Sequence, residues 1–353
     1  QHPWYKRYPG GENPFYNATA PHAYSVLNDW NQGHPLVRQQ WKDCVKYWMT
    51  EYKVDGFRFD LVKGLGDNDS YANNGDSGTN AYNGSRVRNM REIKLAMLEV
   101  NPDCIFINEN LAGDKEENEM AAYGQLNWSN LNYAGCQFAM GYRSGSSLSG
   151  MYAPNNSRTW GSTVSYLESH DEQRLAYQQK TYGDAGVKSN ELAATQRLGS
   201  AAAQMILAPG AHMIWQFSEM GNAENTKNTD GGNNTSPKRV EWSLLDNPLN
   251  AGLVLSYREL IAIRRQNPGL FSKEASFESK MTQINWTTGR TLVSTAGDRQ
   301  LVTVINPNID KAITVDVAFA NPSQDAYYIA SKSHESEPSF DIAAGKVTVP
   351  ANC

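Results

Sequence analysis

The stretch Val54-Asp-Gly-Phe-Arg-Phe-Asp-Leu-Val-Lys-Gly64 predicts a short β-strand over residues 54–60 that ends on a carboxylate. Side chains alternate between the two faces of a strand, so Arg58 and Asp60 lie on one face and the two phenylalanines on the other. A neighbouring cation lowers the pKa of a carboxyl group and keeps it ionised. The pair is either a buried structural ion pair or part of an active site, and later segments of the chain decide between the two.

Strand-like and helical segments alternate over most of the chain. Apolar residues at helical spacing predict four helices, which cover residues 35–48, 85–97, 190–207 and 250–266. Ser85 is the predicted cap of the second. Short apolar runs predict strands over residues 54–60, 104–109, 163–171 and 212–217, with a weaker run over 134–140. This alternation is typical of βα units with a parallel sheet.

The pattern changes after about residue 270. Short alternating runs separated by turn residues occupy positions 283–286, 291–295, 301–305, 313–317 and 327–330. Such runs predict a small antiparallel β domain at the end of the chain.

Composition limits the class of protein. The chain has 353 residues and a net charge of -5, which argues against a nucleic-acid-binding face. No run approaches the roughly 18 apolar residues needed to cross a membrane. Four cysteines lack Cys-x-x-Cys spacing, so buried free thiols are expected at Cys44, Cys104, Cys136 and Cys353. The chain begins without Met or a signal peptide, and we expect it to be processed or to be a fragment.

Three predicted strands end on or near a carboxylate. Parallel strands share a direction, so Asp60, Glu109 and Asp171 should meet at one rim, where sites form in βα barrels and open α/β sheets. With His170 and Arg58 beside them, these acids suit two chemistries. One is a site for a hard metal ion, and the other is acid/base and nucleophilic attack on a glycosidic bond.

The residues around these acids resemble a known family. Gly56-Phe-Arg-Phe-Asp60 with Lys63, the strand ending at Glu109, and Ser169-His-Asp171 followed by Arg174 are similar to three signature motifs of the α-amylase family of glycoside hydrolases (glycoside hydrolase family 13), in the family's order. The segment 212–221 also resembles the family's last barrel strand, although the usual Gly-Gln-Glu is replaced by Gln216-Phe-Ser-Glu219.

The resemblance implies an α/β fold. It would be a portion of a (β/α)8 TIM barrel, about strands four to eight, followed by a small antiparallel β-sandwich. The expected domains are the end of an excursion loop over residues 1–34, a partial catalytic barrel over 35–268 and the β domain over 269–353.

The resemblance also implies a retaining mechanism on α-1,4-glucosidic bonds of starch- or maltodextrin-like α-glucans. Asp60 would be the nucleophile and Glu109 the acid/base, which requires carboxyl groups about 5–5.5 Å apart with unlike pKa values. Asp171 would be the third catalytic carboxylate and, like His170, would hydrogen-bond the hydroxyls of the distorted sugar. The substrate-binding set implied by the motifs is Arg58, Lys63, His170 and Arg174.

Some features depart from the family pattern. Gly64 stands where many relatives carry a His, and Ser169 replaces a common Asn. The family's earliest motif, an Asp and a His on the third strand, has no counterpart, so we expect this chain to need a missing N-terminal barrel segment and to be poorly active alone. No cofactor is expected for the chemistry itself. Residues 27–31 resemble a short motif in which Asp29 would bind a structural calcium ion; otherwise Asp29 is a turn residue before a helix.

Other activities share the same residues. Transglycosylation, isomerisation or a branching reaction uses the same acids. A non-catalytic scaffold relative is a different class, and the three carboxylates weigh against it. A metal-dependent hydrolase is disfavoured because no His or Cys cluster accompanies the acids. A polymeric substrate favours an extracellular, periplasmic or cell-surface location.

Overall fold

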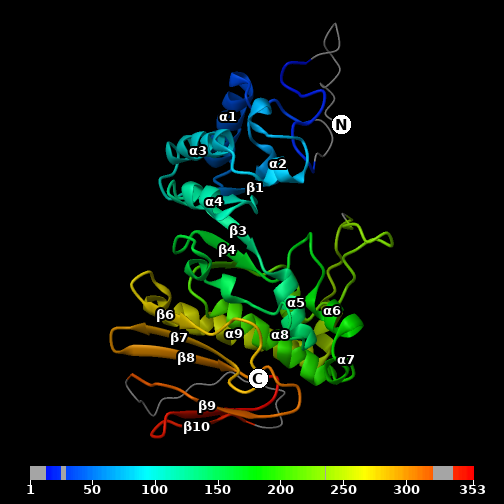
Figure 1. The fold of residues 1–353 in the computed structure, drawn as a ribbon, viewed down its shortest axis with the longest axis vertical. Helices are drawn as coiled ribbons and strands as arrows, with labels where there is room; N and C mark the ends of the chain where they lie inside the picture. Colours follow the sequence, from blue (N-terminus) through cyan, green and yellow to red (C-terminus); the bar gives the residue numbers. More distant parts are fainter. Residues whose placement is uncertain (1–12, 25–28, 235, 321–336) are drawn as a thin grey trace. The chain divides into compact units, whose positions relative to one another are not determined.

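The computed structural model describes residues 13–24, 29–234, 236–320 and 337–353, and is drawn in Figure 1. The chain divides into two compact units. The first unit comprises residues 1–128 and 157–164, and the second comprises 129–156 and 165–353. The predicted domain boundaries after residues 34 and 268 stay predictions.

The first unit alternates helices and strands. Its elements are α1 (Pro35–Glu51), β1 (Gly56–Phe59), η1 (Val62–Gly64), η2 (Asn68–Ser70), α2 (Asp76–Asn80), α3 (Gly84–Leu98), β2 (Ile105–Asn108), α4 (Asp114–Ala121) and the first part of β3 (Leu126–Asn130). The predicted helices beginning at 35 and near 85 and the strands at 54–60 and 104–109 are therefore confirmed. The cap of α3 is Asn83 and not Ser85, because the Asn83 side chain accepts from the N–H groups of Ser85 and Arg86.

The second unit begins with helices and ends with antiparallel strands. Its helices are α5 (Asn132–Met140), η3 (Ser149–Met151), η4 (Ala153–Asn156), α6 (Leu175–Tyr182), α7 (Ala185–Lys188), α8 (Glu191–Ile206), η5 (Ser218–Met220), η6 (Trp242–Asp246), α9 (Pro248–Gln266) and η7 (Pro268–Phe271). Its strands are β5 (Ala211–Met213), β6 (Ser276–Ser279), β7 (Arg290–Ala296), β8 (Arg299–Ile305), β9 (Ile313–Asp316), β10 (Ser339–Asp341) and β11 (Lys346–Val349), and β4 (Thr163–Tyr166) ends in it.

The sheet that carries the acids has the strand order β1-β2-β3-β4-β5. β1 pairs with β2 and β2 with β3 in parallel, as predicted for βα units. Gly56 lies opposite Ile105 and Phe59 opposite Asn108. Since β1 and β2 run in the same direction and register, the residues that follow them, Asp60 and Glu109, leave the sheet at the same edge.

One strand predicted before residue 270 is wrong. Residues 134–140 belong to helix α5, and the third strand is β3, which the sequence analysis missed. An apolar run such as Ala134-Gly-Cys-Gln-Phe-Ala-Met140 cannot be assigned to helix or strand by periodicity when most of its side chains are buried. β3 reads Leu-Asn-Trp-Ser-Asn, which shows no apolar run at all.

The core of the first unit lies between its helices and β1–β2. Val45 and Met49 of α1 and Met90 and Met97 of α3 are buried in one cluster. The rings of Phe59 and Phe106 stack on adjacent strands with centroids 4.3 Å apart. These contacts fix the two strand ends on which the acids stand.

The antiparallel strands form two three-stranded sheets with orders β6-β7-β8 and β10-β11-β9. In Figure 1, β6, β7 and β8 lie beside α8 and α9, and residues of this sheet and of both helices share one core cluster. The predicted antiparallel region is confirmed, but residues 283–286 form no strand. The predicted strand at 327–330 lies outside the described residues.

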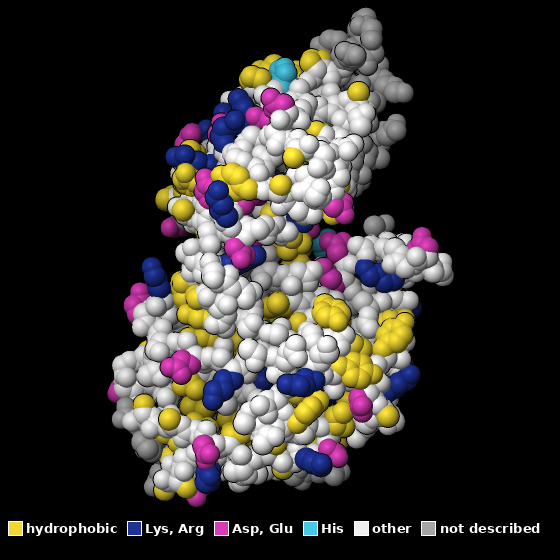
Figure 2. Space-filling model, in the orientation of Figure 1, with side chains coloured by type: hydrophobic (Ala, Val, Ile, Leu, Met, Phe, Trp, Pro, Cys, Tyr) yellow, Lys and Arg dark blue, Asp and Glu magenta, His cyan; other side chains and the backbone are white. Residues whose placement is uncertain are grey.

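The surface charges, the apolar character of the helices and the burial of the cysteines follow the expectations from composition in part. On the face drawn in Figure 2, Asp and Glu side chains lie among the Lys and Arg side chains within each unit. No helix in the described ranges is long and apolar enough to cross a membrane. All four cysteines are free; Cys104 and Cys136 are buried as expected, whereas Cys44 is exposed and Cys353 is half-buried.

Candidate active site

One guanidinium contacts both acids at the ends of β1 and β2. Arg58 Nη1 lies 2.6 Å from Asp60 Oδ1, and Nη2 lies 3.0 Å from Glu109 Oε2. The predicted alternation in β1 thus holds, because Arg58 and Asp60 share one face. The Arg58 guanidinium also stacks on the indole ring of Trp128, with its central carbon 4.1 Å from the ring centroid.

The loop after β1 turns sharply to bring the acids together. Leu61 adopts a left-handed backbone with φ 41°, which is uncommon for a residue with a branched side chain. In this conformation the Leu61 N–H donates to Glu109 Oε2 at 2.9 Å. The backbone N–H groups of Glu109 and Val62 then donate to the carbonyls of Phe59 and Glu109. The turn therefore binds the acid at the end of the neighbouring strand.

The two acids stand in unlike surroundings. The side chain of Glu109 is 17% exposed and that of Asp60 is 75% exposed. Burial raises the pKa of Glu109, and the charge of Asp60 raises it further, against the opposing effects of the Leu61 N–H and Arg58. A buried carboxyl with a raised pKa is the kind of group that serves as a general acid.

Lys63 lies in η1, a short distance after Asp60 in the sequence. Burial, and then the charge of Arg86, lower the pKa of its amine, which lies 5.8 Å from the centroid of the Tyr24 ring. The next residue, Gly64, has no room for a side chain, since a Cβ there would lie 2.7 Å from Cε1 of His22. The imidazole of His22 thus fills the space beside Gly64.

The surroundings of Asp29 do not fit a calcium ion. Calcium takes six to eight oxygen ligands, usually with several carboxylates. Asp29 is one carboxylate whose oxygens face the Asn17 amide at 2.7 Å and the His22 imidazole at 3.7 Å. Burial disfavours charged His22, but its contacts with Asp29 and the Ala23 carbonyl raise its pKa overall. Among the described residues no group of three or more His, Cys, Asp or Glu side chains could hold a metal ion.

The third predicted motif, which carries His170 and Asp171, lies in the second unit. His170 Nε2 lies 3.3 Å from Asp171 Oδ2, and both side chains are partly exposed. Asp171 follows β4 by five residues, so it stands on the loop and not at the strand end. Two residues far along the chain hold it, because Lys227 Nζ donates to the Asp171 carbonyl at 2.7 Å and the Asn233 amide donates to Oδ1 at 3.4 Å.

Arg174 is buried in this structure. Its guanidinium lies 3.7 Å from the centroid of the Trp215 ring, donates to the Gln216 carbonyl at 2.9 Å and pairs with Glu168 at 3.5 Å. Burial raises the pKa of Glu168, which also accepts from the Ser218 hydroxyl. Arg174 thus anchors the loop that carries His170 and Asp171, and a direct contact of Arg174 with substrate stays a prediction.

The family described as "Alpha amylase, catalytic domain" matches residues 20–247. The chain belongs to the α-amylase family. The match spans all three predicted motifs, which are the residues around the acids after β1 and β2 and the loop that follows β4. The resemblance proposed from the motifs is confirmed, and so is the placement of the chain among glycoside hydrolases.

Relatives in sequence are plant isoamylases. The chloroplastic isoamylase 1 of Arabidopsis thaliana is 49% identical over 57 residues, which is 15% of this chain and 7% of that protein. The chloroplastic isoamylase SU1 of Zea mays is 48% identical over 60 residues, or 17% of this chain and 7% of that protein. The chain thus matches a small part of these relatives' length.

Several solved structures share the fold. An α-amylase from H. orenii has a TM-score of 0.64 at 19% identity over 93% of this chain and 65% of that one. Amy13B of Eubacterium rectale has a TM-score of 0.67 at 17% identity over 99% and 75%. A GBS pullulanase solved with maltotetraose has a TM-score of 0.65 at 15% identity over 92% and 49%. At these identities the likeness shows the fold alone.

The sequence motifs do not indicate the side chains that hold Arg58, Arg174 and Asp171 in place. Trp128 under Arg58 was missed because β3 was not recognised. Glu168 could have been found, since it directly precedes Ser169-His-Asp171 at the end of an apolar run. Lys227 and Asn233 carry no local signal, because they meet Asp171 only through the fold.

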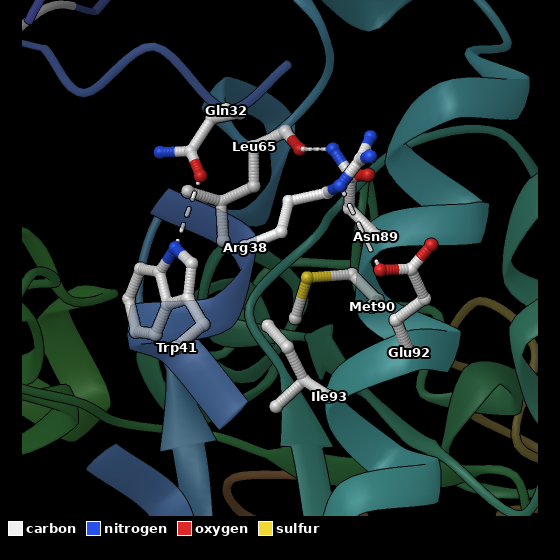
Figure 3. Close-up of a pocket in the computed structure, with 8 residues that line it drawn as sticks. All are labelled: Gln32, Arg38, Trp41, Leu65, Asn89, Met90, Glu92 and Ile93. Atoms are coloured by element: carbon white, nitrogen blue, oxygen red, sulfur yellow. Dashed lines mark hydrogen bonds and ion pairs between the residues drawn. The ribbon is translucent and has the colours of Figure 1, made fainter. Parts of the chain in front are cut away.

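A pocket between α1 and α3 is separate from the acids. Figure 3 shows the side chains that line it, among which Trp41 Nε1 donates to Gln32 at 3.0 Å and Arg38 pairs with Glu92 at 3.7 Å. None of the predicted site residues lines it. The residues at the ends of β1 and β2, and not this pocket, are the candidate active site of the first unit.

Proposed function

We propose that this chain carries the catalytic acids of a retaining glycoside hydrolase that cleaves α-1,4-glucosidic bonds of starch- or maltodextrin-like α-glucans. One observation carries the proposal. A single guanidinium, Arg58, contacts an exposed and a buried carboxylate at adjacent parallel strand ends, and burial raises the pKa of the second. Retaining hydrolysis needs such a pair of close but unlike acids.

In the first step, Asp60 would be the nucleophile. One oxygen of its carboxylate forms a bond to the anomeric carbon while the bond from that carbon to the glycosidic oxygen breaks. Glu109 gives its proton to the departing oxygen, so the leaving sugar departs neutral and a glycosyl ester remains on Asp60. Arg58 holds the attacking carboxylate, since its Nη1 lies 2.6 Å from Asp60 Oδ1.

In the second step, Glu109 would act as a base. It takes a proton from water while the water oxygen bonds to the anomeric carbon, and the ester bond to Asp60 breaks. The product carries its original anomeric configuration, and both acids return to their starting forms. Hydrogen-bonding of Glu109 by the Leu61 N–H keeps the carboxyl in place through both steps.

The remaining residues would bind sugar. We propose that His170 and Asp171 hydrogen-bond the hydroxyls of the sugar under attack and that Lys63 contacts the leaving-group side. We further propose that β1–β5 correspond to strands four to eight of the family's barrel and that the antiparallel sheets form its C-terminal sandwich. An extracellular, periplasmic or cell-surface location follows if the substrate is a polymer too large to enter a cell.

The linkage has a second candidate. The sequence relatives are named isoamylases and reach 48–49% identity over 57–60 residues. An isoamylase activity is therefore the alternative to cleavage of α-1,4 bonds. Amylopectin contains both α-1,4 and α-1,6 bonds, and proton NMR of the digest reports separately which of them disappears. Products longer than the substrate would instead indicate transglycosylation.

The acids can be told apart by rescue. The purified protein is compared with Asp60→Asn, Glu109→Gln and a control, Glu51→Gln, on a maltooligosaccharide and on an aryl maltoside whose leaving group needs no proton. We expect Glu109→Gln to lose activity on the maltooligosaccharide but to release the aryl group in a single burst, with turnover restored by added azide, which attacks the glycosyl-enzyme without needing a base. Asp60→Asn should lose both activities, and the exposed control should keep both. Full activity of Asp60→Asn on the maltooligosaccharide would refute the nucleophile.

A further inference from the structure

We infer that Arg86 and Glu116 are positioning residues for the acid pair, because one buried ion pair joins the loop after β1 to the loop after β2. The inference rests on the proposed function of Asp60 and Glu109. Neither Arg86 nor Glu116 belongs to the motifs that point to the family, and neither contacts the acids directly. All of the residues involved lie in the first unit.

The ion pair is fully buried and two-pronged. Arg86 and Glu116 are 0% and 1% exposed. Arg86 Nε donates to Glu116 Oε1 and Nη2 donates to Oε2, each at 2.7 Å. Such paired, charge-assisted hydrogen bonds fix the orientation of both groups as well as their distance.

Arg86 holds the loop that follows Asp60. Its Nη1 donates to the carbonyl of Lys63 at 2.8 Å, and the Tyr71 hydroxyl donates to the same carbonyl at 2.8 Å. Lys63 lies three residues beyond Asp60, on the far side of the strained turn at Leu61. The guanidinium thus fixes the end of the turn that carries the nucleophile.

Glu116 holds the loop that follows Glu109. The side-chain amide of Asn110, the residue directly after Glu109, donates to Glu116 Oε1 at 2.9 Å. Asn110 is itself buried, and the backbone N–H of Asn83 donates to Glu116 Oε2 at 2.8 Å. A continuous chain of contacts therefore runs from the Lys63 carbonyl through Arg86 and Glu116 to Asn110.

The hydrogen-bonding capacity of the pair is used in full. Arg86 has five N–H donors, and they reach Glu116 twice and the carbonyls of Lys63, Thr79 and Ala81. A buried ion pair is weak evidence for stability, since apolar side chains of the same volume often replace one without loss. A satisfied polar network instead rigidifies the groups that it joins. Here those groups are the two loops that carry the catalytic acids.

Loosening of these two loops would lower the pKa of Glu109. Burial is the largest cause of its raised pKa. If the loop after β2 moves, water reaches the carboxyl and its pKa falls. A misplacement of about 1 Å can also cost roughly 100-fold in rate.

The test uses two variants of different severity and a matched control. Arg86→Lys keeps the charge but cannot make the same five bonds, and Asn110→Ala removes only the link to the residue after Glu109. The control Met97→Ala opens a cavity in the core of the same unit, far along α3 from Arg86, and lowers stability without removing a hydrogen bond of Arg86 or Glu116. Folding is checked by circular dichroism and thermal unfolding.

Two readouts are measured on each protein. The first is the pKa of Glu109 by carbon NMR of carboxyl-labelled glutamate, assigned by the signal lost in Glu109→Gln. The second is kcat and KM for a maltooligosaccharide. We expect both variants to lower the pKa of Glu109 and to lower kcat about 10- to 100-fold with little change in KM, and the control to change neither.

The outcomes separate this inference from the proposed function. An unchanged pKa of Glu109 in a folded Asn110→Ala or Arg86→Lys variant overturns the positioning role, and so does a fall in stability with kcat unchanged. A shifted pKa in a protein that hydrolyses no glucan supports the positioning role and contradicts the proposed function.

Discussion

Arg58 is the residue on which the first-unit site depends. Its two terminal nitrogens reach Asp60 and Glu109 at 2.6 and 3.0 Å, and its flat face rests on Trp128. A planar, delocalised guanidinium can do all three at once, whereas a lysine ammonium is a point charge. The same contacts serve two purposes, because the guanidinium holds Asp60 in place and its charge opposes part of the rise in the pKa of Glu109.

Replacing Arg58 should therefore change both rate and pH dependence. We expect Arg58→Met to lower kcat/KM by roughly 100- to 1,000-fold, comparable to losing a preorganised donor from an active site. Its charge lowers the pKa of Glu109, so removal raises that pKa further. Glu109 must be protonated to act as acid, so the basic limb of the pH profile moves to higher pH.

A surface variant provides the comparison for Arg58. Arg88→Met removes a partly exposed arginine that pairs with Asp67 in the same unit. It should leave the rate and the pH limb unchanged. A basic limb that stays in place in Arg58→Met, or moves to lower pH, would contradict the assigned effect of Arg58 on Glu109.

At the scale of elements, the pairing of β1 with β2 sets the distance between the acids. Gly56 lies opposite Ile105, and a Cβ at Gly56 would lie 2.0 Å from the Ile105 carbonyl oxygen. The two backbones approach so closely that no larger residue fits without moving a strand. Gly56 precedes the alternating Phe-Arg-Phe run, so its role is to let the strands approach.

A single added methyl group at this position should break the pairing. We expect Gly56→Ala to lower the free energy of unfolding by about 3 kcal/mol or more, at the upper end of overpacking effects. Gly84→Ala is the control, since its Cβ would meet the Tyr82 ring at an ordinary 3.8 Å at the start of α3. Urea unfolding of both variants measures the difference. Equal stability of Gly56→Ala and the native protein would show that β1 and β2 are not so close.

Sequence patterns predicted elements where one periodicity dominates. The helix from Pro35 and the strand ending at Asp60 are confirmed, although the helix buries only part of its predicted apolar face, with Val37 and Val45 buried and Trp48 exposed. β3 could not be predicted, since its short, largely polar run is held by pairing with β2 and not by its own propensity. The ion pair of Arg86 with Glu116 joins residues 30 positions apart, and no local pattern connects them.

At the scale of the whole molecule, the second unit joins helices and antiparallel strands in one core. Leu292 and Ile305 of β7 and β8 are buried in the same cluster as side chains of α5, α8 and α9. Arg290, also buried, donates to the Gln204 side chain of α8 at 2.6 Å. The strands of β6–β8 should therefore unfold together with these helices.

Hydrogen exchange can test this shared core. Leu292→Ala should lower the free energy of unfolding by about 2–5 kcal/mol, as expected for a buried leucine. The amides of α8 should lose protection to the same extent as those of β7 and β8. Lys346→Ala, on an exposed ion pair of β11, should leave both unchanged. Faster exchange in β7 and β8 with α8 unchanged would show that the sheet opens separately.

The most direct measurement of the central claim is capture of the glycosyl-enzyme. The protein is incubated with a 5-fluoro-α-glucosyl fluoride, which forms the ester readily and releases it slowly, and the labelled peptide is identified by mass spectrometry. We predict one added fluoroglucosyl group on Asp60 and none in Asp60→Asn, because Asp60 is the exposed carboxylate of the pair held by Arg58. A label on another residue, or turnover of α-glucan by Asp60→Asn, would contradict the account.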